Sequence, residues 1–81
     1  MDDVKILELM SLAFGQNLSG RSLAVCTPET VQGWDSIAFL NLISLLEEAF
    51  DISIEIEDIA KMTQGGVVIR EVVAEKTRDS I

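Results

Sequence analysis

The spacing of apolar and polar positions predicts helices along most of the chain, and the clearest one covers residues 36–50. Its apolar side chains recur at intervals of three and four residues, so they share one face of a helix: Phe39, Leu42, Ile43, Leu46 and Phe50. Asp35 and Ser36 come first, where a polar N-cap side chain binds the free amides of the first turn. Ser36 is thereby predicted to lie at the positive end of a helix dipole, a position that suits an anionic group such as a phosphate.

Two further helices are predicted near the ends of the chain. Residues 2–14 place on one face the side chains of Ile6, Leu9, Met10 and Ala13, and Gly15 follows as a natural C-cap. A helix over residues 66–76 would bury Val68, Ile69, Val72 and Val73. The β-branched side chains of this last segment lower its helix propensity.

Residues 16–34 form a connection of unusual length for a compact domain. We expect it to be attached to the core by Leu18, Leu23, Val25 and Val31. Thr27 and Pro28 are typical of the first positions of a one-turn helix. Cys26 is interpreted as a small buried apolar residue, because the chain offers no histidine that could activate its thiol.

Residues 51–58 contain Ile52, Ile54 and Ile56 in strict alternation, which taken alone predicts a β-strand. Only residues 67–69 or 72–73 could pair with it. An extended segment whose isoleucines lie on the helices is therefore the more economical prediction. We expect a short helix over residues 55–62 to follow it, with Ile56 and Ile59 turned inward.

Composition places the chain among small globular proteins of one domain, residues 1–81. Apolar residues make up 48% of the 81 positions, and no apolar run reaches the roughly 18 residues that span a bilayer. The acidic start, Met1-Asp2-Asp3, is unlike a signal peptide, and one cysteine cannot form an internal disulfide framework. We therefore expect a cytoplasmic protein in a reducing compartment.

The net charge of −8 is concentrated in the middle of the chain, where no basic residue occurs between Arg21 and Lys61. A surface of one sign disfavours nucleic acid and anionic membranes as partners. It favours proteins that carry basic docking patches. The alternative is that the acidic side chains only keep the protein soluble.

The residue inventory excludes several kinds of catalytic and metal site. Without histidine there is no Ser-His or Cys-His pair and no zinc site of the usual ligands. Residues 51–55 have the spacing of calcium-loop ligands, but Ile56 stands where that loop needs glycine. Residues 65–66 are glycines without the Lys-Ser or Lys-Thr of a phosphate-binding loop. We therefore expect no metal and no catalysis by this chain, although Ser36 can still be the acceptor in a reaction that another enzyme catalyses.

The segment Gly33-Trp34-Asp35-Ser36-Ile37 resembles the modification motif of the acyl carrier proteins, which include carriers of fatty-acid and polyketide synthesis and peptidyl carriers. In that family Asp-Ser and an aliphatic residue open the second of four helices. Residues 46–52, Leu-Glu-Glu-Ala-Phe-Asp-Ile, resemble the end of that helix, and residues 27–34 resemble the lead-in of many discrete carriers. The specificity comes from the distance between Asp-Ser and Glu-Glu-x-Phe, because a bare Asp-Ser pair is usually only a helix cap.

This resemblance implies an all-α fold, a small four-helix bundle with a long first loop and a short third helix. It replaces the strand at residues 52–56 by a loop. It also implies that Ser36 accepts 4′-phosphopantetheine from coenzyme A, through a phosphopantetheinyl transferase that uses Mg²⁺, and that Asp35 helps to position the serine. Acyl or aminoacyl thioesters would then be loaded by a ligase or acyltransferase and used by a ketosynthase or other pathway enzymes. The carrier itself would be a monomer and would not be an enzyme.

The outward face of the helix predicted for residues 36–50 is the candidate docking surface of such a carrier. At about 100° per residue it comprises Ile37, Leu40, Asn41, Ser44 and Glu48, to which we add Glu47. Isolated exposed apolar residues are ordinary, but Ile37 and Leu40 beside Ser36 also fit a small patch rimmed by acids. The family often has acids where this chain has Ala38 and Asn41. This departure favours a specialised pathway (polyketide, fatty-acid-like or nonribosomal peptide) over a generic fatty-acid synthase.

The main rival hypothesis is a small acidic helical interaction domain. In that case Ser36 only caps a helix, and the acidic side chains only interact with solvent.

Overall fold

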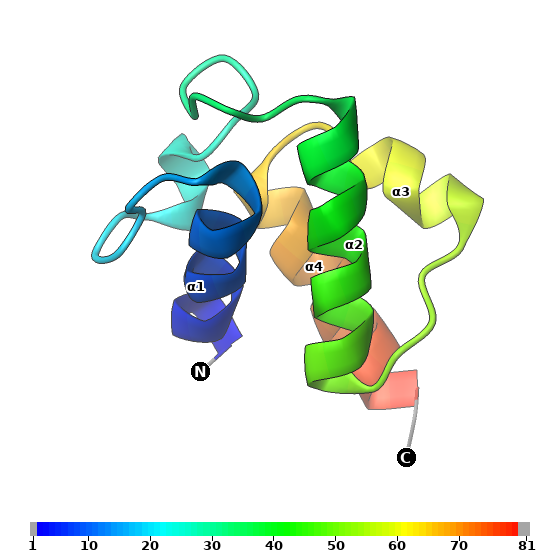
Figure 1. Ribbon diagram of the computed structural model, residues 1–81. Helices are drawn as coiled ribbons and strands as arrows, with labels where there is room; N and C mark the ends of the chain where they lie inside the picture. The colour runs from blue at the N-terminus through cyan, green and yellow to red at the C-terminus, as the bar shows by residue number, and fades with distance from the viewer. Residues whose placement is uncertain (1, 80–81) are drawn as a thin grey trace.

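Four α-helices and one short 3₁₀-helix make up the described part of the chain, residues 2–79 of a computed structural model (Figure 1). In chain order they are α1 (Asp2–Phe14), η1 (Leu23–Val25), α2 (Ser36–Phe50), α3 (Ile56–Met62) and α4 (Gly66–Asp79). Residues 2–79 contain no strand, so the prediction of an all-helical fold is confirmed. None of these helices has the combination of length and apolar character that crossing a membrane requires.

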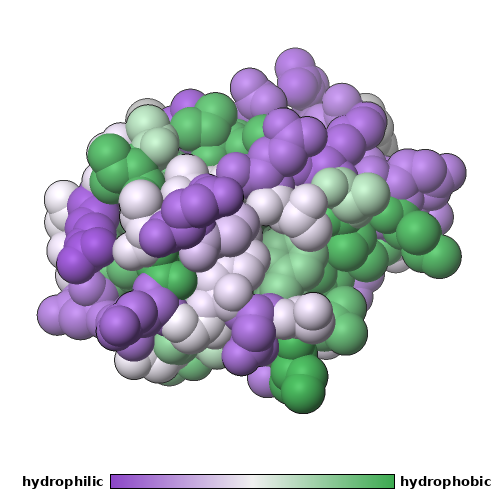
Figure 2. Space-filling model, turned by 90° about the horizontal axis from the view of Figure 1, so that it is seen from above, coloured by the Kyte–Doolittle hydropathy of each residue, from purple (hydrophilic) through white to green (hydrophobic). Residues whose placement is uncertain are grey.

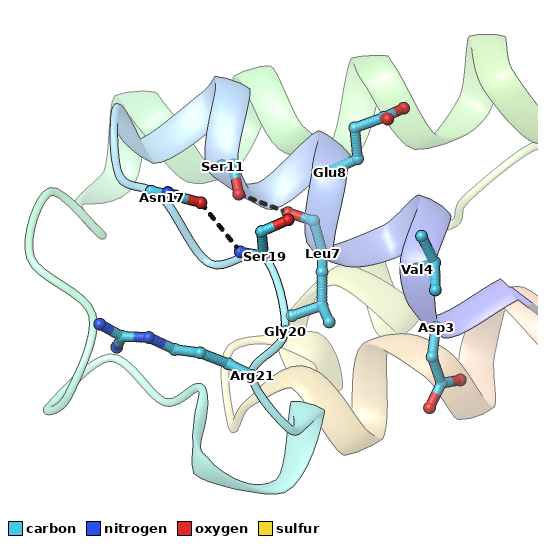
Figure 3. Close-up of a pocket in the computed structure, with 9 residues that line it drawn as sticks. All are labelled: Asp3, Val4, Leu7, Glu8, Ser11, Asn17, Ser19, Gly20 and Arg21. Atoms are coloured by element: carbon cyan, nitrogen blue, oxygen red, sulfur yellow. Dashed lines mark hydrogen bonds between the residues drawn. The ribbon is translucent and has the colours of Figure 1, made fainter.

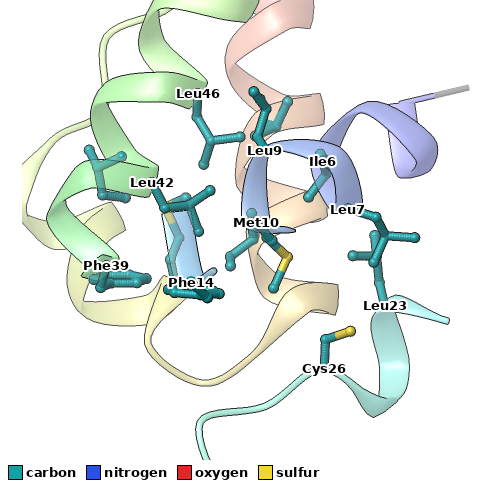
Figure 4. Packing of buried hydrophobic residues seen from close by; sticks show 14 of the residues in the cluster. Ile6, Leu7, Leu9, Met10, Phe14, Leu23, Cys26, Phe39, Leu42 and Leu46 are labelled. Carbon is teal, nitrogen blue, oxygen red and sulfur yellow. The ribbon is translucent and has the colours of Figure 1, made fainter. Parts of the chain in front are cut away.

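The core lies where α1, α2 and α4 meet, with α4 behind the other two in Figure 1. The largest fully buried side chains come from every α-helix and from the connection: Ile6, Met10, Leu18, Leu42, Leu46, Met62, Ile69 and Val73. Figure 4 shows side chains of α1 and α2 directed toward one another across this core. The predicted inner faces are therefore largely confirmed, although three of their members are only partly buried: Ala13, Phe50 and Val68.

The connection between α1 and α2 is attached to the core at three of the four predicted positions, namely Leu18, Leu23 and Val31. Val25, the fourth, is 54% exposed, so that prediction is wrong. At Thr27 the chain makes a single turn, in which the amides of Thr30 and Val31 donate to the Thr27 carbonyl at 3.0 and 2.9 Å, although no helix continues from it. The hydroxyl of Thr30 accepts from the Thr27 amide at 2.9 Å and donates to the Val25 carbonyl at 2.6 Å.

Cys26 is fully buried, as predicted, and burial raises the pKa of its thiol, partly offset by the nearby charge of Arg21. The thiol donates to the Ser22 carbonyl at 3.5 Å. A raised pKa disfavours the nucleophilic thiolate, which agrees with a structural role.

Residues 52–55 form an irregular loop between α2 and α3, so the strand that alternation alone predicted is absent. The carboxylate of Glu47 accepts from the Ile54 amide at 2.9 Å, and a side chain thus takes the place of a neighbouring strand. Ile52 is buried, but Ile56 is 83% exposed, which contradicts the prediction that it faces inward. The alternation therefore marks a loop that lies across the core.

A buried carboxylate connects α3 to α4. Asp58 is 7% exposed, and its Oδ2 lies 2.9 Å from Nζ of Lys76 and accepts from the Glu55 amide at 3.2 Å. The hydrogen bond from Lys76 lowers the pKa of Asp58 despite the opposing effect of burial, and the same bond raises the pKa of Lys76. This long-range pair adds a polar link between α3 and α4 to the apolar anchoring of α3 by the fully buried Met62.

We predict that Leu46→Ala destabilises the fold by about 2–5 kcal/mol, because it removes a fully buried side chain and leaves a cavity. Leu40 is the matched control, a leucine of the same helix that is 57% exposed. Leu40→Ala should change the free energy of unfolding by no more than about 0.5 kcal/mol. Urea denaturation followed by circular dichroism measures both, and equal losses would show that the assignment of inner and outer faces is incorrect.

We also predict that Asp58 contributes to the acid sensitivity of the fold. Its folded-state pKa lies below the ordinary value of 3.8, so its contribution to stability is complete above that value and is lost as the pH falls through the folded-state pKa. Asp58→Asn should therefore be less stable than the wild type near neutral pH, and the difference should shrink as the solution is acidified. Thermal denaturation over a pH series measures it. Glu57→Gln, at an exposed acid of the same helix, should show no such trend, and a pH-independent difference for Asp58→Asn would contradict the prediction.

Candidate functional site

The site begins at the N-terminus of α2, where Asp35 is the N-cap. Its backbone is extended, with φ −125° and ψ 179°, and its Oδ1 accepts from the Ala38 amide at 2.8 Å. Ser36 is the first residue of the helix and is exposed. No residue in the described range is hydrogen bonded to the Ser36 hydroxyl. Asp35 therefore caps the helix, whereas the neighbouring Ser36 presents a hydroxyl to solvent.

The electrostatics of this helix end favour a negative group. No described residue accepts a hydrogen bond from the amides of Ser36 and Ile37. The first turn of α2 also contains no acidic side chain beyond the cap. Free amides and the helix dipole together stabilise an anion placed here, whereas the carboxylate of Asp35 partly offsets this effect.

An aromatic stack precedes the cap. The indole of Trp34 stacks on the ring of Phe14, with centroids 4.8 Å apart, and on that of Phe39, with centroids 6.0 Å apart. Gly33 has φ +85°, and a Cβ at this position would collide with the carbonyl oxygen of Phe14. The approach to α2 is thus held against the C-terminal end of α1. The apolar periodicity does not predict this contact, for which the adjacent glycine and tryptophan are the available signal.

An open groove of about 410 Å³ lies beside Ser36. Its lining comes from α2, α3 and the preceding loop: Pro28, Trp34, Asp35, Ser36, Phe39, Leu40, Ile59 and Thr63. Most of these residues are apolar. Figure 2 views the molecule from the end at which α2 begins and shows apolar side chains intermingled with hydrophilic ones on that face. A flexible chain attached to the Ser36 oxygen could therefore extend along an apolar surface.

The outward residues of α2 lie where the sequence predicted them. Ile37 is 76% exposed and Leu40 is 57% exposed, and three polar members of the candidate docking surface are exposed as well: Asn41, Ser44 and Glu48. Glu47 differs from the others, since it is partly buried and its carboxylate binds the Ile54 amide. Glu47 therefore has a structural role, which is to hold the loop after α2. Docking by any of these residues remains a prediction.

A second groove, of about 340 Å³, lies between α1 and residues 17–21 (Figure 3). It shares no lining residue with the groove beside Ser36. Two of its polar side chains are bonded within the chain: the Ser11 hydroxyl donates to the Leu7 carbonyl at 2.7 Å, and Asp3 pairs with Arg70 at 3.0 Å. We therefore assign no function to this groove.

Comparison with known proteins adds no family. No protein-family model matches the chain, and neither the curated proteins nor the solved structures searched contain a match. The assignment of a function therefore depends on the residues around Ser36 and on their geometry.

We predict that Asp35 and Ser36 have separable roles. Asp35→Ala removes the N-cap hydrogen bond and should lower the free energy of unfolding by about 1 kcal/mol. Ser36→Ala should leave stability nearly unchanged, because this side chain makes no hydrogen bond to a described residue. Urea denaturation of the two variants tests this, and a larger loss in Ser36→Ala would mean that the serine is the structural cap.

Proposed function

We propose that the chain is an acyl carrier protein that holds acyl or aminoacyl intermediates as thioesters on a 4′-phosphopantetheine arm attached to Ser36. The observation that carries the proposal is the exposed hydroxyl of Ser36, which no described residue binds, one residue after the Asp35 cap and beside an apolar groove. The resemblance of residues 33–37 to the modification motif of carriers gives this geometry its chemical interpretation. The finer description of the fold, an acyl-carrier-like four-helix bundle with a short third helix, belongs to the same proposal.

In the proposed modification the Ser36 Oγ forms a bond to the phosphorus that carries pantetheine in coenzyme A. The bond from that phosphorus to the bridging oxygen of the pyrophosphate breaks, and adenosine 3′,5′-bisphosphate leaves. The hydroxyl proton passes to a base of the transferase, since this chain has no histidine and no residue of the described range 2–79 places a base on the hydroxyl. Asp35 uses Oδ1 for the cap, so its second carboxylate oxygen is left to interact with the Mg²⁺ of the transferase.

The properties of α2 also support the proposal. A phosphodiester on Ser36 carries one negative charge, which the free amides of the first turn stabilise. Ile37 and Leu40 lie on the exposed face beside the serine. Acidic side chains flank this face, which suits transferases, loading enzymes and condensing enzymes that have basic docking patches. We propose a monomeric, cytoplasmic carrier of a specialised biosynthetic pathway.

The proposal predicts modification at a single position. The apo protein, incubated with coenzyme A, Mg²⁺ and a broad-specificity phosphopantetheinyl transferase, should gain the mass of one phosphopantetheinyl group in intact mass spectrometry. Ser36→Ala should gain none while remaining folded, because Asp35 still caps α2.

Ser53→Ala is the matched control, since this serine is exposed in the loop after α2 and belongs neither to the candidate docking surface nor to the groove beside Ser36. It should be modified like the wild type. Failure of well-folded wild-type protein to react with several transferases would contradict the carrier proposal. The acidic interaction domain, in which the serine has no acceptor role, would then be the better hypothesis.

A further inference from the structure

The aromatic stack joins three parts of the chain at the start of α2. Phe14 is the last residue of α1, Trp34 belongs to the connection, and Phe39 lies in the first half of α2. Their rings are nearly parallel, with interplanar angles of 17° and 13°. Phe14 and Phe39 are both 5% exposed, whereas Trp34 is half-buried. The rings of two packed helices thus hold the indole in place.

The backbone around Trp34 is also fixed. The Trp34 amide donates to the Val31 carbonyl at 3.4 Å, and the Asp35 amide donates to the Gly33 carbonyl at 3.0 Å. Gly33 lies so close to the carbonyl of Phe14 that no side chain fits between them. The first turn of α2, by contrast, has free amides and one side-chain cap. The attachment of Trp34 therefore restrains the segment that determines where the Ser36 hydroxyl lies.

We infer that Trp34 is a positioning residue for the modification of Ser36, acting through the stack that it forms with Phe14 and Phe39. The inference rests on the proposed carrier function. Loss of the stack leaves the exposed face of α2 in place but frees the first turn, so the hydroxyl no longer has one orientation relative to the docking surface. An enzyme that binds this face would still bind, but it would transfer the group more slowly, because the reacting oxygen would be misplaced.

Phe14 separates this explanation from direct contact with the transferase. Trp34 lines the groove beside Ser36, so a partner could touch it, but Phe14 is buried and is not part of that lining. A substitution of Phe14 removes the support of the indole without changing the groove residues. An effect of Phe14 on the reaction would therefore act through the position of Trp34.

The experiment measures steady-state transfer from coenzyme A to the apo protein with one transferase, at a temperature where circular dichroism shows every variant to be folded. We expect Trp34→Ala to lower kcat about tenfold with KM for the carrier changed by no more than about twofold. Phe14→Leu should lower kcat by about threefold, and Trp34→Phe, which keeps a stacking ring, should restore most of the rate. Val73→Ala, a core substitution in α4 outside the stack, is the stability control and should retain the wild-type kcat.

Wild-type rates in both Trp34→Ala and Phe14→Leu would overturn the inference while leaving the carrier function intact. Slow transfer in Trp34→Ala with a normal rate in Phe14→Leu would overturn it in favour of direct contact between Trp34 and the transferase. An equal loss of kcat in Val73→Ala would show that the slower transfer results from general destabilisation. That result would also overturn the inference. If Trp34→Ala does not fold, the kcat values of Phe14→Leu and Trp34→Phe still test whether the stack positions Ser36. A wild-type chain that is not modified would overturn the carrier function and this inference together.

Discussion

The burial of one face of α2 is the constraint on which the rest of the structure depends. Leu42 and Leu46 are completely buried and fix both the depth and the rotation of this helix against α1 and α4. Once the rotation is fixed, Ile37 and Leu40 face outward because they lie on the opposite side of a helix with about 3.6 residues per turn. The same packing brings Phe39 to the indole of Trp34. The exposure of Ser36 and its neighbours is therefore a consequence of core packing, not a local property of the Asp-Ser motif.

The parts of the fold that the sequence predicts best are those where a single period applies over many residues. Helix α2 was predicted with its observed bounds, because its apolar positions keep a helical spacing and Asp35 supplies a recognisable cap. At residues 52–55 the expected extended segment is confirmed, whereas the strand that alternation alone predicts is absent, because alternation is the signature of a strand only when another strand accepts its hydrogen bonds. Here Glu47 accepts one of them, and that contact cannot be read from the local pattern. Ile56 followed the alternation in sequence but lies at the exposed start of α3.

Contacts between distant residues account for most of what the sequence did not predict. Lys76 pairs with Asp58, which is 18 positions earlier in the chain. Phe14 and Trp34 are separated by the whole connection between α1 and α2. The fold also changes the interpretation of the acidic middle of the chain. Asp58 is neutralised by its partner and Glu47 is held by the Ile54 amide, so less of the negative charge is free for docking than the sequence suggests.

The separation of cap from acceptor is what makes the Asp35–Ser36 pair suited to modification. A serine that caps its own helix uses its side-chain oxygen to accept a hydrogen bond from a backbone amide. A group attached to that oxygen would disrupt this N-cap hydrogen bond. Asp35 makes the cap here, so substitution on the Ser36 oxygen leaves the hydrogen bond to Ala38 intact. Trp34 directly precedes this pair, and we infer that its stack with Phe14 and Phe39 restrains both the cap and the hydroxyl. A carrier needs this combination, because its attachment point must stay exposed and oriented before and after the arm is added, on a helix whose end does not unfold.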